Sequence, residues 1–171
     1  DAPALERGYS RSARRNIHKA NEAGLRIKEG ITSTDLMILH RLRYRDLIGV
    51  AKVDYERFQE LMDQLLDRGM GYTVGVMDKE GHLLAASFYI RFKDRLTFIF
   101  NGNDQESLKN GATHYLKNFV IRKFAGKGII MDFEGSDTPD FARFYRQYGA
   151  HNEPYPRWEA GPLSVLRRLF N

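Results

Sequence analysis

The stretch IIMDFEGSDTPDFARFYRQYGA, residues 129–150, decides the fold. It opens on IIMDF, an almost entirely apolar run of the kind that forms a short strand in the buried centre of a sheet. Phe141, Phe144, Tyr145 and Tyr148 follow at positions i, i+3, i+4 and i+7, which is the spacing of one face of a helix. We therefore expect a central strand followed by a helix, and most of the helix's aromatic side chains should belong to the core.

Three successive segments before this stretch are predicted to form strands. They cover residues 72–77, 82–92 and 96–101, and the links DKEG and KD between them are typical of tight turns, so the strands should form an antiparallel meander. Residues 110–128 have helical periodicity. Because this helix connects strand 96–101 to strand 129–133, those two strands should be parallel neighbours. The expected core face of the helix consists of Ala112, Tyr115, Leu116, Phe119 and Val120.

The first predicted helix covers residues 12–24, with Ser12 as its N-cap and Gly24 as its stop. One face of it is apolar, and the other is strongly basic. This basic stripe consists of Arg11, Arg14, Arg15, His18 and Lys19. The stripe is either a solvated helix face or an electrostatic guide for a phosphate-bearing ligand, formed above all by Arg14 and Arg15.

Further helices and a last strand complete the predicted order. Residues 33–47 should form a helix on which His40 lies at the surface or its boundary. Residues 54–70 should form another, capped by Asp54. Pro154 and Pro156 favour an edge strand around Tyr155–Trp158, and a short helix with Arg167 and Arg168 exposed should close the chain.

Composition limits the class of protein. With 171 residues and 42% apolar side chains, the chain is long enough for one α/β domain over residues 1–171. The absence of cysteine excludes disulfides and thiolate chemistry, and the net charge of +5 favours anionic partners. No apolar run of transmembrane length and no leader pattern is visible, so we expect a cytoplasmic protein. No residues have metal-ligand spacing, so no metal is predicted, and Ser136 lacks the histidine that a serine hydrolase would need.

This order of elements resembles the GNAT acyltransferase fold, and more narrowly its FemAB-like branch. The likeness rests on YSRSARRNIHKANEAGL (residues 9–25), IIMDFEGS (residues 129–136) and FARFYRQYGA (residues 141–150). It implies a mixed sheet in which an antiparallel meander is followed by a β-α-β crossover, with helices on both faces. It also implies that a second, similar domain can precede this one, so that the chain would be the C-terminal half of a longer protein.

The resemblance implies a binding site for an acyl-CoA. Its pantetheine arm would lie along strand 96–101, at Phe100 and Asn101. Its pyrophosphate would lie at the start of the following helix, where backbone N–H groups and the helix dipole attract phosphate. The residues of this cradle are Lys109, Asn110, Gly111, Ala112 and Thr113. The same run is also compatible with an ordinary helix-start turn, and the FemAB branch uses aminoacyl-tRNA as its acyl donor.

The resemblance also assigns catalytic roles. Tyr145 matches the tyrosine that protonates the leaving thiolate in many GNAT enzymes, although a core aromatic is an equal alternative. Asp132 and Glu134 lie two positions apart at a strand end and should share a face. Glu134 is then the expected base or amine-binding carboxylate, with Asp132 orienting it. Alternatively, Asp132 binds loop N–H groups and Glu134 pairs with an arginine.

The leading hypothesis is therefore an N-acyltransferase that moves an acyl group, first of all acetyl from acetyl-CoA, to a primary amine. A FemAB-type peptidyltransferase that uses aminoacyl-tRNA and acts on a cell-wall precursor is the second hypothesis. A non-catalytic GNAT-like module that binds a ligand or a protein is the third. A preceding GNAT-like domain and a homodimer are the protein partners left open.

Overall fold

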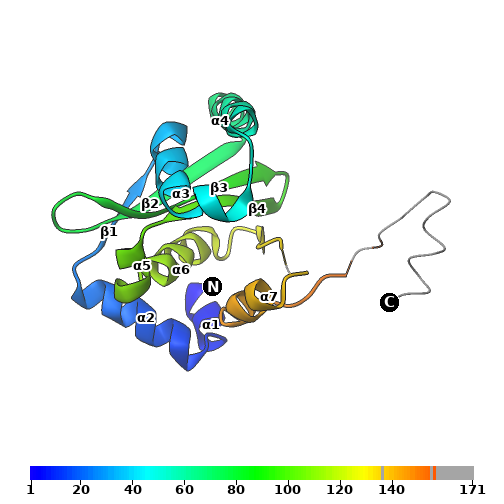
Figure 1. Ribbon diagram of the computed structural model, residues 1–171. Coiled ribbons are helices and arrows are strands. Elements are labelled where there is room, and N and C mark those ends of the chain that lie inside the picture. Colours follow the sequence, from blue (N-terminus) through cyan, green and yellow to red (C-terminus); the bar gives the residue numbers. More distant parts are fainter. Residues whose placement is uncertain (136, 155, 157–171) are drawn as a thin grey trace, which may run out of the picture.

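A computed structural model describes residues 1–135, 137–154 and 156, with the backbone alone for residues 44–48. Within this part of the chain a five-stranded sheet is covered by helices on both faces (Figure 1). In chain order the elements are α1 (Ala2–Arg7), α2 (Arg11–Glu22), β1 (Arg26–Glu29), α3 (Ser33–Ile48), α4 (Lys52–Asp67), β2 (Gly71–Met77), β3 (Leu83–Phe92), β4 (Arg95–Asn103), α5 (Gln105–Asn110), α6 (Ala112–Phe124), β5 (Ile130–Asp132) and α7 (Pro139–Arg146). The predicted α/β class is confirmed.

The strands lie in the sheet in the order in which they occur in the chain. Strands β1 to β4 are antiparallel to their neighbours, whereas β5 runs parallel to β4. Helix α6 makes the crossover between these two parallel strands. Both the predicted meander and the predicted crossover are therefore confirmed.

Strand β1 is not predicted from the sequence. It pairs with β2 from Arg26 opposite Met77 to Glu29 opposite Val74. Its sequence, RIKE, offers only Ile27 as a partly buried side chain, so no alternation of polarity marks it. The short helices α1 and α5 are missed as well, because each is too short to show a helical period.

Each face of the sheet has its own core. Helices α3 and α4 pack over Phe88 of β3, where Leu36 and Met62 are fully buried. Helix α6 and part of α2 cover the opposite face, where Tyr89 and Leu116 are buried. The predicted core face of α6 is confirmed, since all five of its side chains belong to this second core.

Helix α7 ends at Arg146, so Tyr148 lies in the turn after it, and this helix and turn pack through most of their aromatic side chains. Tyr145 and Tyr148 are 8% and 6% exposed, and Phe144 packs against the cluster formed by Tyr148 and the start of α2. Phe141 differs, because 54% of it is exposed. The prediction that most of these aromatics are core is confirmed, with Phe141 as the exception.

Two helix starts differ from the sequence prediction. Ser10, not Ser12, caps α2, because its Oγ accepts a hydrogen bond from the Ala13 N–H at 3.1 Å. Helix α4 starts at Lys52, so Asp54 lies in its first turn and is not the cap. The strand predicted at Tyr155–Trp158 and the closing helix lie outside the described residues. Among the described helices, none combines the length and apolarity needed to span a membrane.

Candidate functional site

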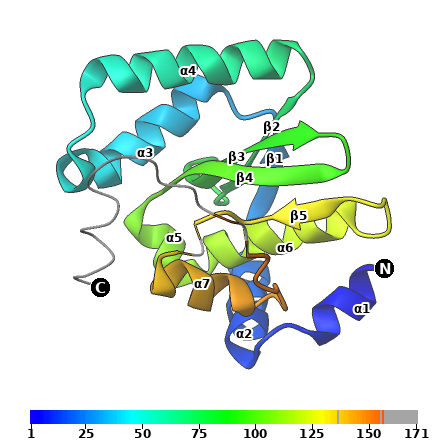
Figure 2. The same cartoon turned by 90° about the vertical axis from the view of Figure 1, so that its right-hand side faces the viewer.

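The two parallel strands, β4 and β5, pair at three positions and then separate. They pair from Arg95 opposite Ile130 to Thr97 opposite Asp132, where β5 ends. Strand β4 continues alone to Asn103, past the end of β5, as Figure 2 shows. This leaves one edge of β4 without a neighbouring strand, and an open strand edge can hydrogen-bond an extended, amide-bearing ligand.

The register shows which backbone groups face this opening. The Asp104 N–H donates to the Leu84 carbonyl at 3.0 Å, so a ladder hydrogen bond joins this pair of opposite residues. Hydrogen-bonded and non-hydrogen-bonded pairs alternate along an antiparallel ladder. Counted from the bonded pair Asp104 and Leu84, Asn101 and Ser87 form a non-hydrogen-bonded pair. The backbone of Asn101, one of the residues expected to bind the acyl donor, therefore points toward the open edge.

His40 of α3 occupies part of that edge. Its Nδ1 lies 2.6 Å from the Asn101 carbonyl oxygen, and its ring centroid lies 4.2 Å from that of Phe100. The prediction of a surface histidine is wrong, because His40 is only 8% exposed. Burial lowers the pKa of His40, so the imidazole is neutral and donates from Nδ1 to the carbonyl. Phe100 also packs toward α3 and α4, away from the opposite face of the sheet.

Asp132, at the end of β5, is held by two hydrogen bonds to its carboxylate. Its Oδ2 accepts from Arg95 at 2.9 Å, and its Oδ1 accepts from the Glu134 N–H at 3.1 Å. Arg95 also binds the Glu153 carboxylate at 3.0 Å. Asp132 thus binds a loop N–H group, as one of the two alternatives predicts, and it is Asp132 instead of Glu134 that pairs with an arginine.

Glu134 and Tyr145 lie on the loop and helix that follow β5. Glu134 is exposed and has a backbone φ of +52°, which is uncommon for a residue with a side chain. The Tyr145 ring stacks on Phe133 with centroids 4.7 Å apart. Burial, together with the charge of Glu134, raises the pKa of Tyr145 to about 12. The charge of Glu134 therefore acts on the Tyr145 hydroxyl, whereas Asp132 and Glu134 form no buried carboxylate pair.

Lys117 is a residue that the sequence reasoning missed. It lies on α6 and is only 2% exposed, and its Nζ lies 3.1 Å from the centroid of the Phe98 ring and 3.2 Å from the Tyr89 hydroxyl. Phe133, which stacks on Tyr145, lies 5.9 Å from the same nitrogen. Burial holds the pKa of Lys117 well below its usual range, which favours the uncharged amine.

The start of α6 is covered by protein. Gly111 has a φ of +79°, and a Cβ there would lie 2.2 Å from the carbonyl oxygen of Asn16 in α2. The Asn110 side chain caps the Ala112 N–H at 3.3 Å, and Lys109 pairs with Glu106. At Gly111, within the predicted phosphate cradle, the backbone of α2 therefore lies close to the glycine.

The residues Lys109, Asn110, Gly111, Ala112 and Thr113 do lie together at the junction of α5 and α6. Ala112 is buried, and the Thr113 Oγ1 is buried without a hydrogen-bond partner in the described residues. This run serves at least as a helix start, which was the alternative interpretation. Its binding of phosphate stays a prediction.

His114, one turn into α6, is engaged inside the protein. Its Nδ1 lies 2.8 Å from the Tyr148 hydroxyl, and its ring contacts Phe144. Burial lowers the pKa of His114 to about 4, so the ring is neutral at pH 7 and its Nδ1 accepts a hydrogen bond from the Tyr148 hydroxyl. Among the described residues no group of three or more His, Cys, Asp or Glu side chains is placed to hold a metal ion.

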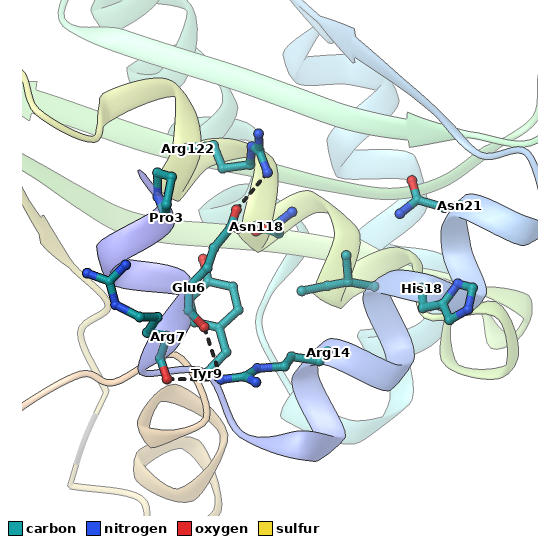
Figure 3. A pocket seen from close by; sticks show the side chains of 10 residues that line it. Pro3, Glu6, Arg7, Tyr9, Arg14, His18, Asn21, Asn118 and Arg122 are labelled. Carbon is teal, nitrogen blue, oxygen red and sulfur yellow. Dashed lines mark hydrogen bonds and ion pairs between the residues drawn. The ribbon is translucent and has the colours of Figure 1, made fainter. Parts of the chain in front are cut away.

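Arg14 and Arg15 are not brought together with Glu134 and Tyr145. Arg14 lines a groove of about 610 Å³ between α1, α2 and α6, which we call the α1–α2–α6 groove (Figure 3). The lining residues are Pro3, Glu6, Arg7, Tyr9, Arg14, Ile17, His18, Asn21, Asn118 and Arg122. Arg15 is exposed and lies outside it.

Comparisons with known proteins give matches of structure alone. No protein-family model and no curated protein sequence matches the chain. FemX superposes with a TM-score of 0.69 at 11% identity, over 87% of this chain and 56% of FemX. A protein from Pyrococcus furiosus assigned as an acetyl transferase superposes with a TM-score of 0.61 at 15% identity, over 80% of this chain and 99% of its own.

The aminoglycoside acetyltransferase AAC(6')-Iy, solved with a bisubstrate analogue that contains CoA, is a further match. Its TM-score is 0.55 at 11% identity, over 80% of this chain and 97% of its own. The chain thus spans a little over half of FemX but nearly the whole of single-domain acetyltransferases. The superpositions cover 80–87% of the chain, and the chain has the fold of the GNAT acetyltransferases and FemX.

Proposed function

We propose that the chain is an N-acyltransferase that joins an acyl group, with acetyl-CoA as the first donor to test, to a primary amine. The observation that carries this proposal is that β4 continues past the end of β5, next to the Tyr145 ring, whose centroid lies 6.5 Å from that of Phe98 in β4. Glu134 follows the end of β5 by two residues, and its charge acts on Tyr145. The fold shared with AAC(6')-Iy, which was solved with a CoA-containing bisubstrate analogue, supports acyl-CoA as the donor class.

The reaction would use the residues of this loop in defined roles. Glu134 takes a proton from the incoming ammonium, and the freed nitrogen attacks the thioester carbonyl to form a carbon–nitrogen bond. The carbon–sulfur bond then breaks, the nitrogen releases its second proton to solvent as the amide forms, and the sulfur leaves as a thiolate. Because the pKa of Tyr145 is about 12, its hydroxyl stays protonated and donates a hydrogen bond to this thiolate, which is itself a weaker base.

A second donor class has its own support. Asn16 and Asn110 cover part of the α6 N-terminus, which is the place where the resemblance would put the CoA pyrophosphate. The fold is also shared with FemX at a TM-score of 0.69. An aminoacyl ester on tRNA is therefore the second donor in our proposal, and a binding module without catalysis is the third reading.

Calorimetric titration separates these readings. Acetyl-CoA should bind to the purified protein more tightly than free CoA, since only the acyl form fills the opening beside Tyr145. An absence of binding at millimolar acetyl-CoA would overturn the CoA reading. Incubation with aminoacyl-tRNA and a panel of amines would then distinguish the tRNA-dependent transferase from the binding module.

Variants of the two proposed catalytic residues should lower turnover without unfolding the protein. We expect Glu134→Gln to lower kcat/KM by about 10²-fold or more, the usual range for a lost general base, and Tyr145→Phe to lower it by about tenfold. Asp137→Asn is the matched control, because Asp137 is exposed on the same loop. Equal losses in Glu134→Gln and Asp137→Asn would contradict the role of Glu134.

A further inference from the structure

The α1–α2–α6 groove is cationic. Three arginines, Arg7, Arg14 and Arg122, line it together with the single carboxylate of Glu6 (Figure 3). With His18 neutral, the charged groups of the lining carry a net charge of about +2. A groove of about 610 Å³ is within the size range of sites that hold small molecules.

The arginines keep hydrogen-bond donors for a ligand. Arg14 uses one nitrogen, Nη2, on the carbonyls of Glu6 and Arg7, at 3.3 and 2.9 Å. Arg122 uses Nη1 on the Glu6 carboxylate at 2.7 Å. Each guanidinium has five N–H donors, so both have donors left over. The Arg7 side chain makes no hydrogen bond or ion pair within the described part of the chain.

The groove also has a buried polar wall. Tyr9, which lines it, is only 5% exposed, and no described residue hydrogen-bonds to its hydroxyl. The Oδ1 of Asn118, another lining residue, is likewise buried without a partner in the described residues. Buried polar atoms in native proteins are nearly always satisfied, so unpaired ones beside a groove indicate a polar ligand or ordered water. Burial, with the charge of Glu6, raises the pKa of Tyr9 to about 12, which keeps its hydroxyl a donor.

We propose that the α1–α2–α6 groove binds a small phosphate monoester. The phosphate, close to a dianion at neutral pH, would lie among Arg7, Arg14 and Arg122, since planar guanidinium groups match phosphate oxygens. The polar organic part would lie against Tyr9 and Asn118. This site is separate from Glu134 and Tyr145, and it does not depend on the proposed acyl transfer.

The shape of the charge distribution favours a small ligand over a nucleic acid. The three arginines of the lining come from three helices, α1, α2 and α6, and Figure 3 shows their side chains. Arg15 lies on α2 but outside the groove. A nucleic-acid backbone needs a track of positive charge along its length, and the part of the α2 stripe outside the groove, Arg11, Arg15 and Lys19, would serve it better than the hollow.

The test is an NMR titration of the whole chain at constant ionic strength. Inorganic phosphate, glycerol 3-phosphate and a single-stranded RNA dodecamer serve as probes, and potassium chloride serves as the blank. We expect saturable shifts of the Arg7 and Arg122 Nε–H and Asn118 amide signals, with glycerol 3-phosphate tighter than phosphate. Shifts by RNA alone, or shifts that chloride reproduces, would overturn the proposal.

Two variants with opposite effects keep the test independent of folding damage. Arg7→Gln should weaken glycerol 3-phosphate binding by about fivefold or more, whereas Glu6→Gln should strengthen it by about threefold, because it frees Arg122 from its carboxylate. Arg15→Gln is the control, since it removes the same charge from outside the groove. Equal weakening by Arg15→Gln and Arg7→Gln, or no strengthening by Glu6→Gln, would contradict a site in the groove.

Discussion

Replacing Gly111 by alanine should lower the free energy of unfolding by about 3–5 kcal/mol, one of the larger effects that a single methyl group can have. The new Cβ would lie 2.2 Å from the Asn16 carbonyl oxygen, which is far inside van der Waals contact. The obstacle is backbone, so α2 as a whole must move away from α6. The left-handed backbone at a φ of +79° adds about 1 kcal/mol for a residue with a side chain.

Gly126→Ala separates these two causes. Gly126 has a φ of +74°, and nothing lies within 4 Å of a Cβ built there. Its loss of stability should therefore be about 1 kcal/mol, measured by urea unfolding at equal m-values. If Gly111→Ala cost no more than this control but abolished binding of acetyl-CoA, Gly111 would serve the ligand and not the packing of α2.

Replacing Lys117 by methionine should raise the free energy of unfolding by about 2–4 kcal/mol at pH 7. Met matches the unbranched Lys side chain from Cβ to Cε and lacks the amine, which has no carboxylate beside it among the described residues and lies against the Phe98 ring. The exposed Lys19 on α2 supplies the control, and Lys19→Met should change stability by less than about 0.5 kcal/mol.

The stability of the unmodified chain should also depend on pH through Lys117. The folded pKa of Lys117 is lowered below the usual value of 10.5, so the folded state binds fewer protons than the unfolded state between these two pKa values. Stability should therefore rise with pH, by about 1.4 kcal/mol per pH unit, up to the unfolded pKa, and it should fall as the pH drops toward the folded pKa. Lys117→Met should remove this slope, and an unchanged slope would mean that the amine is charged in the folded protein.

The large elements of the fold follow from the sequence, whereas several of the small ones do not. The meander is visible because its apolar and aromatic runs are separated by short turns, and the crossover is visible because the apolar side chains of α6 repeat at helical spacing. Strand β1 has no such pattern, and it forms because β2 offers an unpaired edge to RIKE. His40 looks like a surface residue in its own helix, yet the bulky rings of Tyr55 and Phe100 enclose it.

The candidate site is predictable in part for the same reason. Glu134 and Tyr145 can be picked out, because the end of a strand and the helix after it are marked by local spacing. The Asp132–Arg95 pair cannot, because it depends on the register of two strands far apart in the chain. Nor can the burial of Lys117, which adjoins the core face of α6 but meets β3 and β4 only in the folded protein.

During synthesis, α1 and α2 leave the ribosome before α6, the helix that both of them contact. Glu6 and Arg122, which join α1 to α6, are 116 positions apart in the chain. A ribosome that adds about 5–20 residues per second would need on the order of ten seconds to cover that distance. For that time the apolar side of α2, with Ala13 and Ala20, has no docking surface, so the nascent chain would present a basic, amphipathic segment to chaperones before α6 emerges.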